Sequence, residues 1–165
     1  MFNIDYALLF QNFPPEIATL LIAMLPIAEL RAAIPVALIG FDMPVWSSYL
    51  WAVIGNLIPA ILLLWLLEPV SKWLMDHSRV FNNFFNWVFT RTRKKFTSKA
   101  AKYGTFITLV LFVAIPLPIT GAWTGTAAAF LFGIPFKKSF TAIVIGVLIA
   151  GMVVTLMTVG ITKVL

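Results

Sequence analysis

Two oppositely charged residues, Glu29 and Arg31, are the clearest candidates for chemistry because they lie within an apolar stretch at residues 17–40. An ionisable side chain at membrane depth is costly unless it is paired or hydrated, so it marks a candidate site. The planar cation of Arg31 suits a phosphate or carboxylate, and Glu29 is a candidate proton carrier. In an extended backbone the two side chains would face the same cavity. In a helix they would diverge. The alternative is a purely structural pair.

A second polar stretch, at residues 116–126, is rich in hydroxyl side chains and glycines. Glycines let backbone amides approach an anion, and a helix N-terminus adds positive potential. Packing of small residues between helices is the alternative. We expect this stretch to lie opposite the charged pair. Its candidate binding residues are Thr120, Gly121, Trp123, Thr124 and Gly125.

The composition indicates a membrane protein without a soluble catalytic centre. Of the 165 residues, 61% are hydrophobic and 11% are charged, which is far from the usual soluble balance. There is no cysteine, the carboxylates are scattered, and the chain lacks a phosphate-binding loop followed by Lys and Ser or Thr. The run Asp76-His77-Ser78 is merely contiguous and is not a spatial triad. We therefore expect no metal, no cofactor and no enzymatic activity.

The apolar segment that contains Glu29 and Arg31 is expected to be broken near this pair. Pro26 and Pro35 flank the pair, and the apolar arms on either side would each rise only about 14 Å at 1.5 Å per residue, or about half a bilayer. We predict a re-entrant helical hairpin over residues 16–40, with a kinked full span as the alternative. A spanning helix is predicted over residues 45–67, which have aromatic residues near both ends.

The second half of the chain shows the same order of segments. We predict a re-entrant hairpin over residues 104–133, turning at Pro116 and Pro118, and a spanning helix over residues 139–160. Between the halves, residues 71–103 are basic and aromatic, with one apolar face at helical spacing. This pattern predicts an amphipathic helix at the membrane interface that contacts anionic lipid. Nucleic-acid binding is not expected because the segment lies between membrane elements. The apolar face consists of Phe81, Phe84, Phe85 and Val88.

An internal repeat relates the two halves. A shift of 91 positions aligns Pro44 with Pro135 and Ser48 with Ser139, and it aligns the pair Ile54-Gly55 with Ile145-Gly146. A shift of 92 aligns Pro26-Ile27 with Pro118-Ile119. Matched Pro, Ser and Gly positions are stronger evidence for a repeat than apolar matches alone. The chain, residues 1–165, is therefore interpreted as one membrane domain made of repeats at 16–70 and 104–165.

Charge predicts the orientation of these repeats. Of the 12 Lys and Arg residues, eight lie in residues 72–102 and two are Lys137 and Lys138. The positive-inside rule places both clusters in the cytoplasm. Each hairpin would then enter and leave on one side, and the two repeats would have inverted topology, as in many secondary transporters. The prediction is an all-α protein of the cytoplasmic membrane, with both termini outside and residues 71–103 in the cytoplasm.

Two strings resemble the signature motifs of the small multidrug export protein family. They are PIAELRAAIP at residues 26–35 and AIPLPITGAWTG at residues 114–125. The family is distantly related to the DedA (VTT-domain) superfamily, so the resemblance implies two re-entrant hairpins and proton-coupled translocation of a lipid such as undecaprenyl phosphate. It also implies roles for Glu29 and Arg31 and for the candidate residues of the second stretch. Ile119 departs from the pattern where glycine is expected, and the second hairpin lacks the arginines typical of its DedA counterpart.

Three hypotheses of function follow. The leading one is a lipid translocase or secondary transporter for an anionic amphiphile such as a polyprenyl phosphate, with proton binding at Glu29. The second is efflux of cationic drugs, attracted by Glu29. The third is a non-transporting membrane scaffold that recruits anionic lipid or a partner. Because two spanning helices cannot easily enclose two polar hairpins, we expect at least a homodimer.

Overall fold

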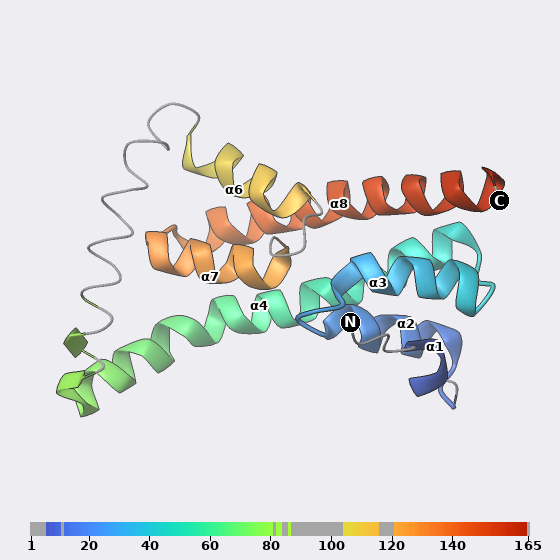
Figure 1. Cartoon of the computed structure of the whole chain (residues 1–165). Coiled ribbons are helices and arrows are strands. Elements are labelled where there is room, and N and C mark those ends of the chain that lie inside the picture. Colours follow the sequence, from blue (N-terminus) through green and yellow to red (C-terminus); the bar gives the residue numbers. More distant parts are fainter. Residues whose placement is uncertain are drawn as a thin grey trace. The chain divides into compact units, whose positions relative to one another are not determined.

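The computed structural model describes residues 6–10, 12–80, 82–83, 86, 104–115 and 121–164, and every regular element within them is helical (Figure 1). This agrees with the predicted all-α class. The elements in chain order are α1 (Tyr6–Leu9), α2 (Pro15–Met24), α3 (Glu29–Pro35), the π-helix η1 (Val36–Gly40), α4 (Val45–His77), α6 (Thr105–Ala114), α7 (Ala122–Phe132) and α8 (Phe136–Val164).

Two of the described helices are long and apolar enough to cross a membrane. They are α4, with 33 residues, and α8, with 29. A span needs about 20 predominantly apolar residues, so both exceed the requirement. They coincide with the two predicted spanning segments. The shorter apolar helices α2, α6 and α7 have 10 or 11 residues each, about half of that length.

Helix α4 continues ten residues beyond its predicted end at Leu67, to His77. The predicted start of an interfacial helix at Ser71 is therefore wrong, because Ser71 lies inside α4. Pro69 does not end the helix, and the turn around it is supported by local polar contacts. The Ser71 hydroxyl donates to the Glu68 carbonyl at 2.9 Å, and Lys72 pairs with the Glu68 carboxylate at 2.8 Å.

Most of the predicted interfacial helix lies outside the described residues. Within it, residues 79–80, 82–83 and 86 are helical. The apolar positions Phe81, Phe84, Phe85 and Val88 and the basic residues from Arg91 to Lys102 are not among those that the structure describes. The amphipathic face and its lipid contacts remain a prediction.

The chain forms two compact units, each containing one pair of short helices and part of both long helices. Unit 1 comprises Met1–Pro59 and Val147–Leu165, and unit 2 comprises Ala60–Gly146. In unit 1, α2 packs against α3, and η1 packs against both α2 and α1. In unit 2, α6 packs against α7. Paired short helices of this kind form a hairpin, in contrast to a single kinked rod.

The break in the first hairpin comes at Leu25, whose backbone is extended (φ −70°, ψ 134°), and Pro26 lies in the turn that follows. Pro35 was predicted as a turn residue, but it is the last residue of α3, and the chain continues directly into η1. Helical bonding resumes directly after the proline, since the Val36 amide donates to the Ala32 and Ala33 carbonyls. The π turn that follows ends where Phe41 donates to the Val36 carbonyl five residues earlier at 3.0 Å.

The first arms of the two hairpins, α2 and α6, have the same length and are separated by a fixed number of residues. Helix α6 begins and ends 90 positions after α2, and α8 begins 91 positions after α4. The extended cap recurs as well, since Ile115 after α6 has φ −81° and ψ 114°. These offsets lie within two residues of the shifts of 91 and 92 in the sequence, and the internal repeat itself stays a prediction.

Glycines on the two long helices allow the hairpins to pack closely. A Cβ built on Gly55 would lie 2.4 Å from the Leu20 carbonyl oxygen of α2. A Cβ on Gly146 would lie 2.6 Å from Val113 Cβ and 3.0 Å from the Val110 carbonyl oxygen of α6. Small residues let helix backbones approach in lipid, where packing contributes strongly to association. Each glycine therefore acts within its own unit as a docking point for a hairpin.

Substituting alanine for Gly55 or Gly146 should destabilise the protein, because the added methyl group meets atoms that are packed too closely to yield. We expect a loss of about 1–3 kcal/mol for each variant, measured as a lower thermal unfolding midpoint in mild detergent. Gly160→Ala is the matched control, since a Cβ there meets nothing within 4 Å. It should be neutral or slightly stabilising. Equal midpoints for Gly55→Ala and Gly160→Ala would contradict the close packing.

Candidate functional site

The first candidate residue, Glu29, starts helix α3 with an unusual backbone. Its φ is +47°, in the left-handed region that non-glycine residues rarely adopt. The Glu29 amide nevertheless donates to the Leu25 carbonyl at 2.9 Å across the turn. A left-handed residue costs about 1–2 kcal/mol, so the turn holds Glu29 in a conformation that the residue itself does not favour. The left-handed backbone at Glu29 therefore sets the direction of its side chain.

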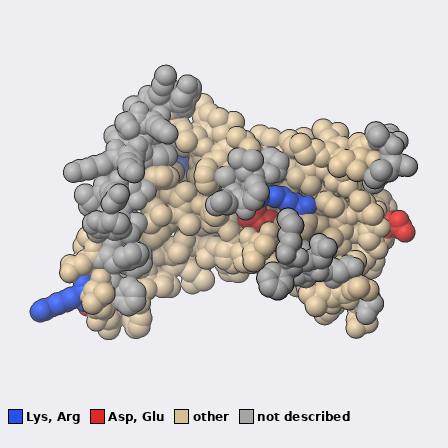
Figure 2. All heavy atoms as spheres, viewed as in Figure 1, with Lys and Arg blue, Asp and Glu red and all other residues tan. Residues whose placement is uncertain are grey.

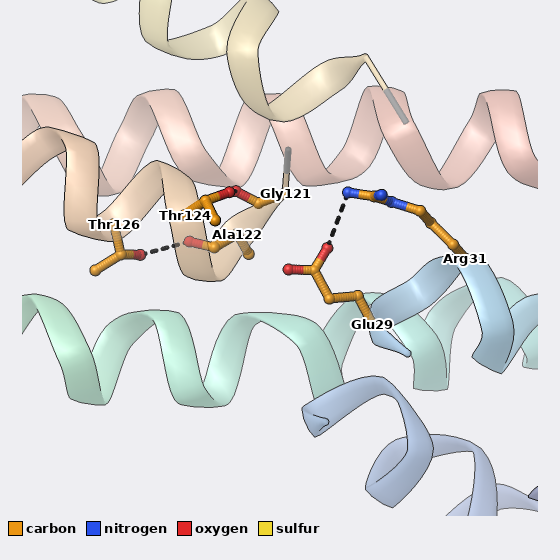
Figure 3. A network of polar contacts seen from close by, with 6 residues as sticks. All are labelled: Glu29, Arg31, Gly121, Ala122, Thr124 and Thr126. Carbon is orange, nitrogen blue, oxygen red and sulfur yellow. Dashed lines mark hydrogen bonds and ion pairs between the residues drawn. The ribbon is translucent and has the colours of Figure 1, made fainter. Parts of the chain in front are cut away.

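The side chains of Glu29 and Arg31 point toward one another and form an ion pair (Figure 3). Arg31 donates from its guanidinium to a Glu29 carboxylate oxygen at 3.4 Å. The Glu29 residue is 5% exposed, and the Arg31 side chain is 23% exposed. The two residues are near-neighbours in a helix that should direct them apart, and the left-handed backbone at Glu29 offers a physical reason why they still meet.

The surroundings of this pair are strongly apolar. Among the described residues on the face that Figure 2 shows, Lys, Arg, Asp and Glu appear at only a few places and the others are uncharged. Neighbours of the pair along the hairpin are buried aliphatic residues, and Ile27 in the turn is 90% exposed. A charge in such a setting is strongly disfavoured unless it is compensated. Pairing with each other therefore stabilises both charges in this setting. The same pairing is what the alternative of a purely structural ion pair requires.

The second candidate group lies at the start of α7 in unit 2. Thr124 is exposed, and its hydroxyl donates to the Gly121 carbonyl at 3.4 Å. Gly121 is buried and Trp123 is half-buried. The first amides of α7 are those that a helix leaves without intrahelical acceptors. Thr120, Pro116 and Pro118 lie outside the described residues.

Gly125 serves packing within unit 2. Its amide donates to the Gly121 carbonyl at 2.8 Å as part of α7, so that group is already occupied. A Cβ on Gly125 would lie 2.5 Å from Val113 Cγ2 of α6. The packing interpretation therefore fits this residue better than anion binding. The Thr126 hydroxyl is likewise satisfied inside the helix, at 2.7 Å from the Ala122 carbonyl (Figure 3).

The two candidate groups belong to different compact units. The Glu29–Arg31 pair is part of unit 1, and residues 121–125 are part of unit 2. The structure brings Glu29 and Arg31 together. The expectation that the second group faces them stays a prediction.

One buried polar residue, Asn56, was absent from the predicted candidates. It lies in the middle of α4, is 1% exposed, and belongs to unit 1 together with Glu29 and Arg31. A lone carboxamide in an apolar span was the available signal. The matched positions of the two halves gave no signal here, because the residue 91 positions later is Val147.

Within the described residues, no group of three or more His, Asp or Glu side chains is arranged to hold a metal ion. His77 is exposed at the end of α4, where its Nδ1 lies 2.9 Å from the Trp73 carbonyl and its ring lies 4.7 Å from the Trp73 ring. These contacts are local to one helix turn. The His77 ring therefore packs on the last turn of its own helix, and these contacts do not form a nucleophile–base pair.

The described chain is that of an all-helical membrane protein with two candidate spans and an ion pair buried at the break of a short-helix hairpin. A protein-family profile described as "Putative small multi-drug export protein" matches residues 29–153. The match covers well over half of the chain and includes the ion pair, α4, both helices of the second hairpin and most of α8. The chain belongs to this family, as the motifs predicted. No curated protein and no solved structure matches it.

Removing one partner of the ion pair should cost more than removing both charges. Arg31→Met leaves the Glu29 carboxylate without that counter-charge, and we expect a loss of about 3 kcal/mol. The double variant Glu29→Gln/Arg31→Met should regain much of this loss because no ion remains. Thermal unfolding in detergent of the two single variants and the double variant provides a double-mutant cycle. Additive effects would show that the two residues do not stabilise one another.

Proposed function

We propose that the protein is a secondary transporter that translocates an anionic amphiphile, such as a polyprenyl phosphate, across the membrane. The observation that carries the proposal is the ion pair within an apolar hairpin, in which Glu29 is buried and Arg31 is partly exposed. A partly exposed cation with a planar donor fork suits a phosphate headgroup. The apolar body around it suits a ligand whose tail stays in lipid.

The pairing itself supports coupling to protons. While Glu29 is ionised, its carboxylate competes with any anion for the Arg31 guanidinium. Protonation of Glu29 removes that competitor, so a phosphate can pair with Arg31 in its place. When the phosphate enters as its monoanion, one proton on Glu29 and one negative charge enter together and the site stays neutral, which reduces the cost of charge at membrane depth.

The proposal includes an inverted repeat with two re-entrant hairpins. It is supported by the packing of α2 on α3 and of α6 on α7, and by the offsets of 90 residues between the starts of α2 and α6 and 91 between those of α4 and α8. The positions of the Lys and Arg clusters along the chain, together with the positive-inside rule, support opposite orientations for the two repeats, with both termini outside. Broken helices near the membrane centre are a recurrent place for transporter sites.

Export of cationic drugs is the second candidate function, and the family description favours it. In that case Glu29 would bind the cation, and the cation would have to displace Arg31 from a partner 3.4 Å away. The requirement for Arg31 separates the two functions. It is essential for an anionic ligand and inhibitory for a cationic one.

Transport should depend on Arg31, and its coupling to protons should depend on Glu29. In proteoliposomes containing a fluorescent short-chain polyprenyl phosphate, Arg31→Ala should slow translocation at least tenfold because the headgroup loses its cation. Glu29→Gln should keep transport but abolish its acceleration by an inward proton gradient. Lys72→Ala is the control, since Lys72 is an exposed partner of Glu68. It should match the wild type.

The same vesicles loaded with ethidium test the alternative. Ethidium efflux that survives Arg31→Ala and disappears in Glu29→Gln would establish cation export instead. Unchanged rates for the lipid probe in both variants would reject the site.

We further propose that the functional form is at least a homodimer and that its partners are anionic membrane lipids. Two spanning helices provide little protein surface around two polar hairpins. Mass photometry in mild detergent should therefore give twice the mass of the 18.4 kDa chain after correction for the micelle. Transport by a strictly monomeric preparation would contradict the dimer.

A further inference from the structure

Asn56 carries a polar group that the protein leaves unsatisfied. The residue is 1% exposed, and its Oδ1 accepts no hydrogen bond from any described residue. A buried acceptor without a donor costs free energy comparable to its lost hydration. In lipid this cost is not relieved by bulk water.

The other buried polar residues of the described chain are treated differently. Their hydroxyl groups donate to backbone carbonyls, mostly four residues earlier in the same helix, and Glu29 pairs with Arg31. The hydroxyl residues are Thr19, Ser48, Ser71, Thr126, Ser139, Thr155 and Thr158. Asn56 therefore does not follow the pattern by which this fold accommodates buried polar groups.

The position of Asn56 relates it to the first hairpin. Its neighbour Gly55 contacts α2 at Leu20 and Ala23, and Ala23 lies two residues before the break at Leu25. Asn56 therefore follows directly on the residue by which α4 meets the C-terminal part of α2, just before the hairpin turns. Glu29 begins the other arm of the same hairpin. Asn56 and the ion pair belong to the same compact unit.

The fold does not require a polar residue at this position. The residue 91 positions later, at the corresponding place of α8, is Val147, which is 0% exposed. The adjacent residues correspond as well, because Gly55 and Gly146 make the same kind of contact with a hairpin. An apolar β-branched side chain therefore satisfies the packing at the matched site, and the carboxamide at position 56 needs another explanation.

We propose that Asn56 is a ligand-binding residue whose Oδ1 accepts a hydrogen bond from a hydroxyl group of an anionic lipid headgroup. This rests on the proposed function, in which Arg31 binds the phosphate of the same headgroup. Oδ1 is an acceptor only, so the ligand must bring an O–H or N–H donor. Arg31 selects a negative charge. Together they select a phosphate that carries a hydroxyl on itself or on its neighbouring alcohol.

Three lipids with the same dioleoyl tails test this selectivity. Phosphatidylglycerol brings alcohol hydroxyls, phosphatidic acid brings a phosphate hydroxyl, and phosphatidylmethanol is an anion with neither. Binding to the purified full-length protein in mild detergent is measured by titration of the thermal unfolding midpoint and by native mass spectrometry. The wild type should bind at least one of the first two about fivefold more tightly than phosphatidylmethanol, the size expected for one hydrogen bond.

Asn56→Val should abolish that preference by bringing the ratio of affinities close to one. It should also raise the unfolding midpoint without ligand, because a buried unsatisfied acceptor is replaced by the residue type found at Val147. Asn56→Ala is the second variant, in case the β-branched side chain does not fit. Thr158→Val, which removes a buried hydroxyl already bonded to Val154, is the control and should keep the wild-type preference.

Two outcomes would overturn the inference. One is equal binding of all three lipids by the wild type, and the other is an unchanged preference in Asn56→Val and Asn56→Ala, as expected if only water meets Oδ1. These failures are distinct from failure of the proposed transport. Transport that needs Arg31 without any hydroxyl preference rejects Asn56 alone. A hydroxyl preference that depends on Asn56 without transport rejects the transport function alone.

Discussion

Polar groups inside an apolar chain must find partners within the protein, and most features of this structure follow from that constraint. Helices satisfy their own backbone, which explains why the described elements are all helical. Where the chain must turn, short local bonds take over, as at Leu25 and at the π turn after Pro35. Most buried hydroxyl groups donate to a backbone carbonyl of their own helix, and Ser48 and Ser139 donate to a carbonyl just before it. The ion pair of Glu29 and Arg31 applies the same requirement to charge, and the Asn56 Oδ1 finds no donor among the described residues.

The large-scale architecture was accessible from the sequence because it depends on hydrophobic length. Apolar runs of sufficient length predicted α4 and α8, and the polar breaks predicted paired short helices. The errors concern prolines. Pro35 was predicted as a turn residue and the first span was predicted to end at Leu67, yet α3 passes into a π turn and α4 continues through Pro69 to His77. Whether a helix tolerates a missing amide depends on how the neighbouring turn widens or bonds, and residue patterns do not encode that response.

The candidate site was predictable in its residues and not in its geometry. Charges at membrane depth pointed to Glu29 and Arg31, but spacing alone left open whether they face each other. The answer depends on one backbone angle, the positive φ of Glu29, which has no signature in a glutamate. Gly125 is a different case. Its place in a polar motif predicted that it binds an anion, whereas in the structure it leaves space for the Val113 side chain. Asn56 differs from its repeat counterpart, and an alignment built on similarity does not draw attention to differences.

The boundaries between the compact units have a mechanical consequence. The chain passes from unit 1 to unit 2 within α4 just after Pro59, and from unit 2 to unit 1 within α8 just after Gly146. Proline removes one hydrogen bond from the helix ladder, and glycine is the most pliable residue of a helix. Each long helix therefore carries a residue that lowers its bending stiffness at the point where one unit ends and the other begins. Bending at Pro59 or Gly146 would leave the contacts within each hairpin unchanged.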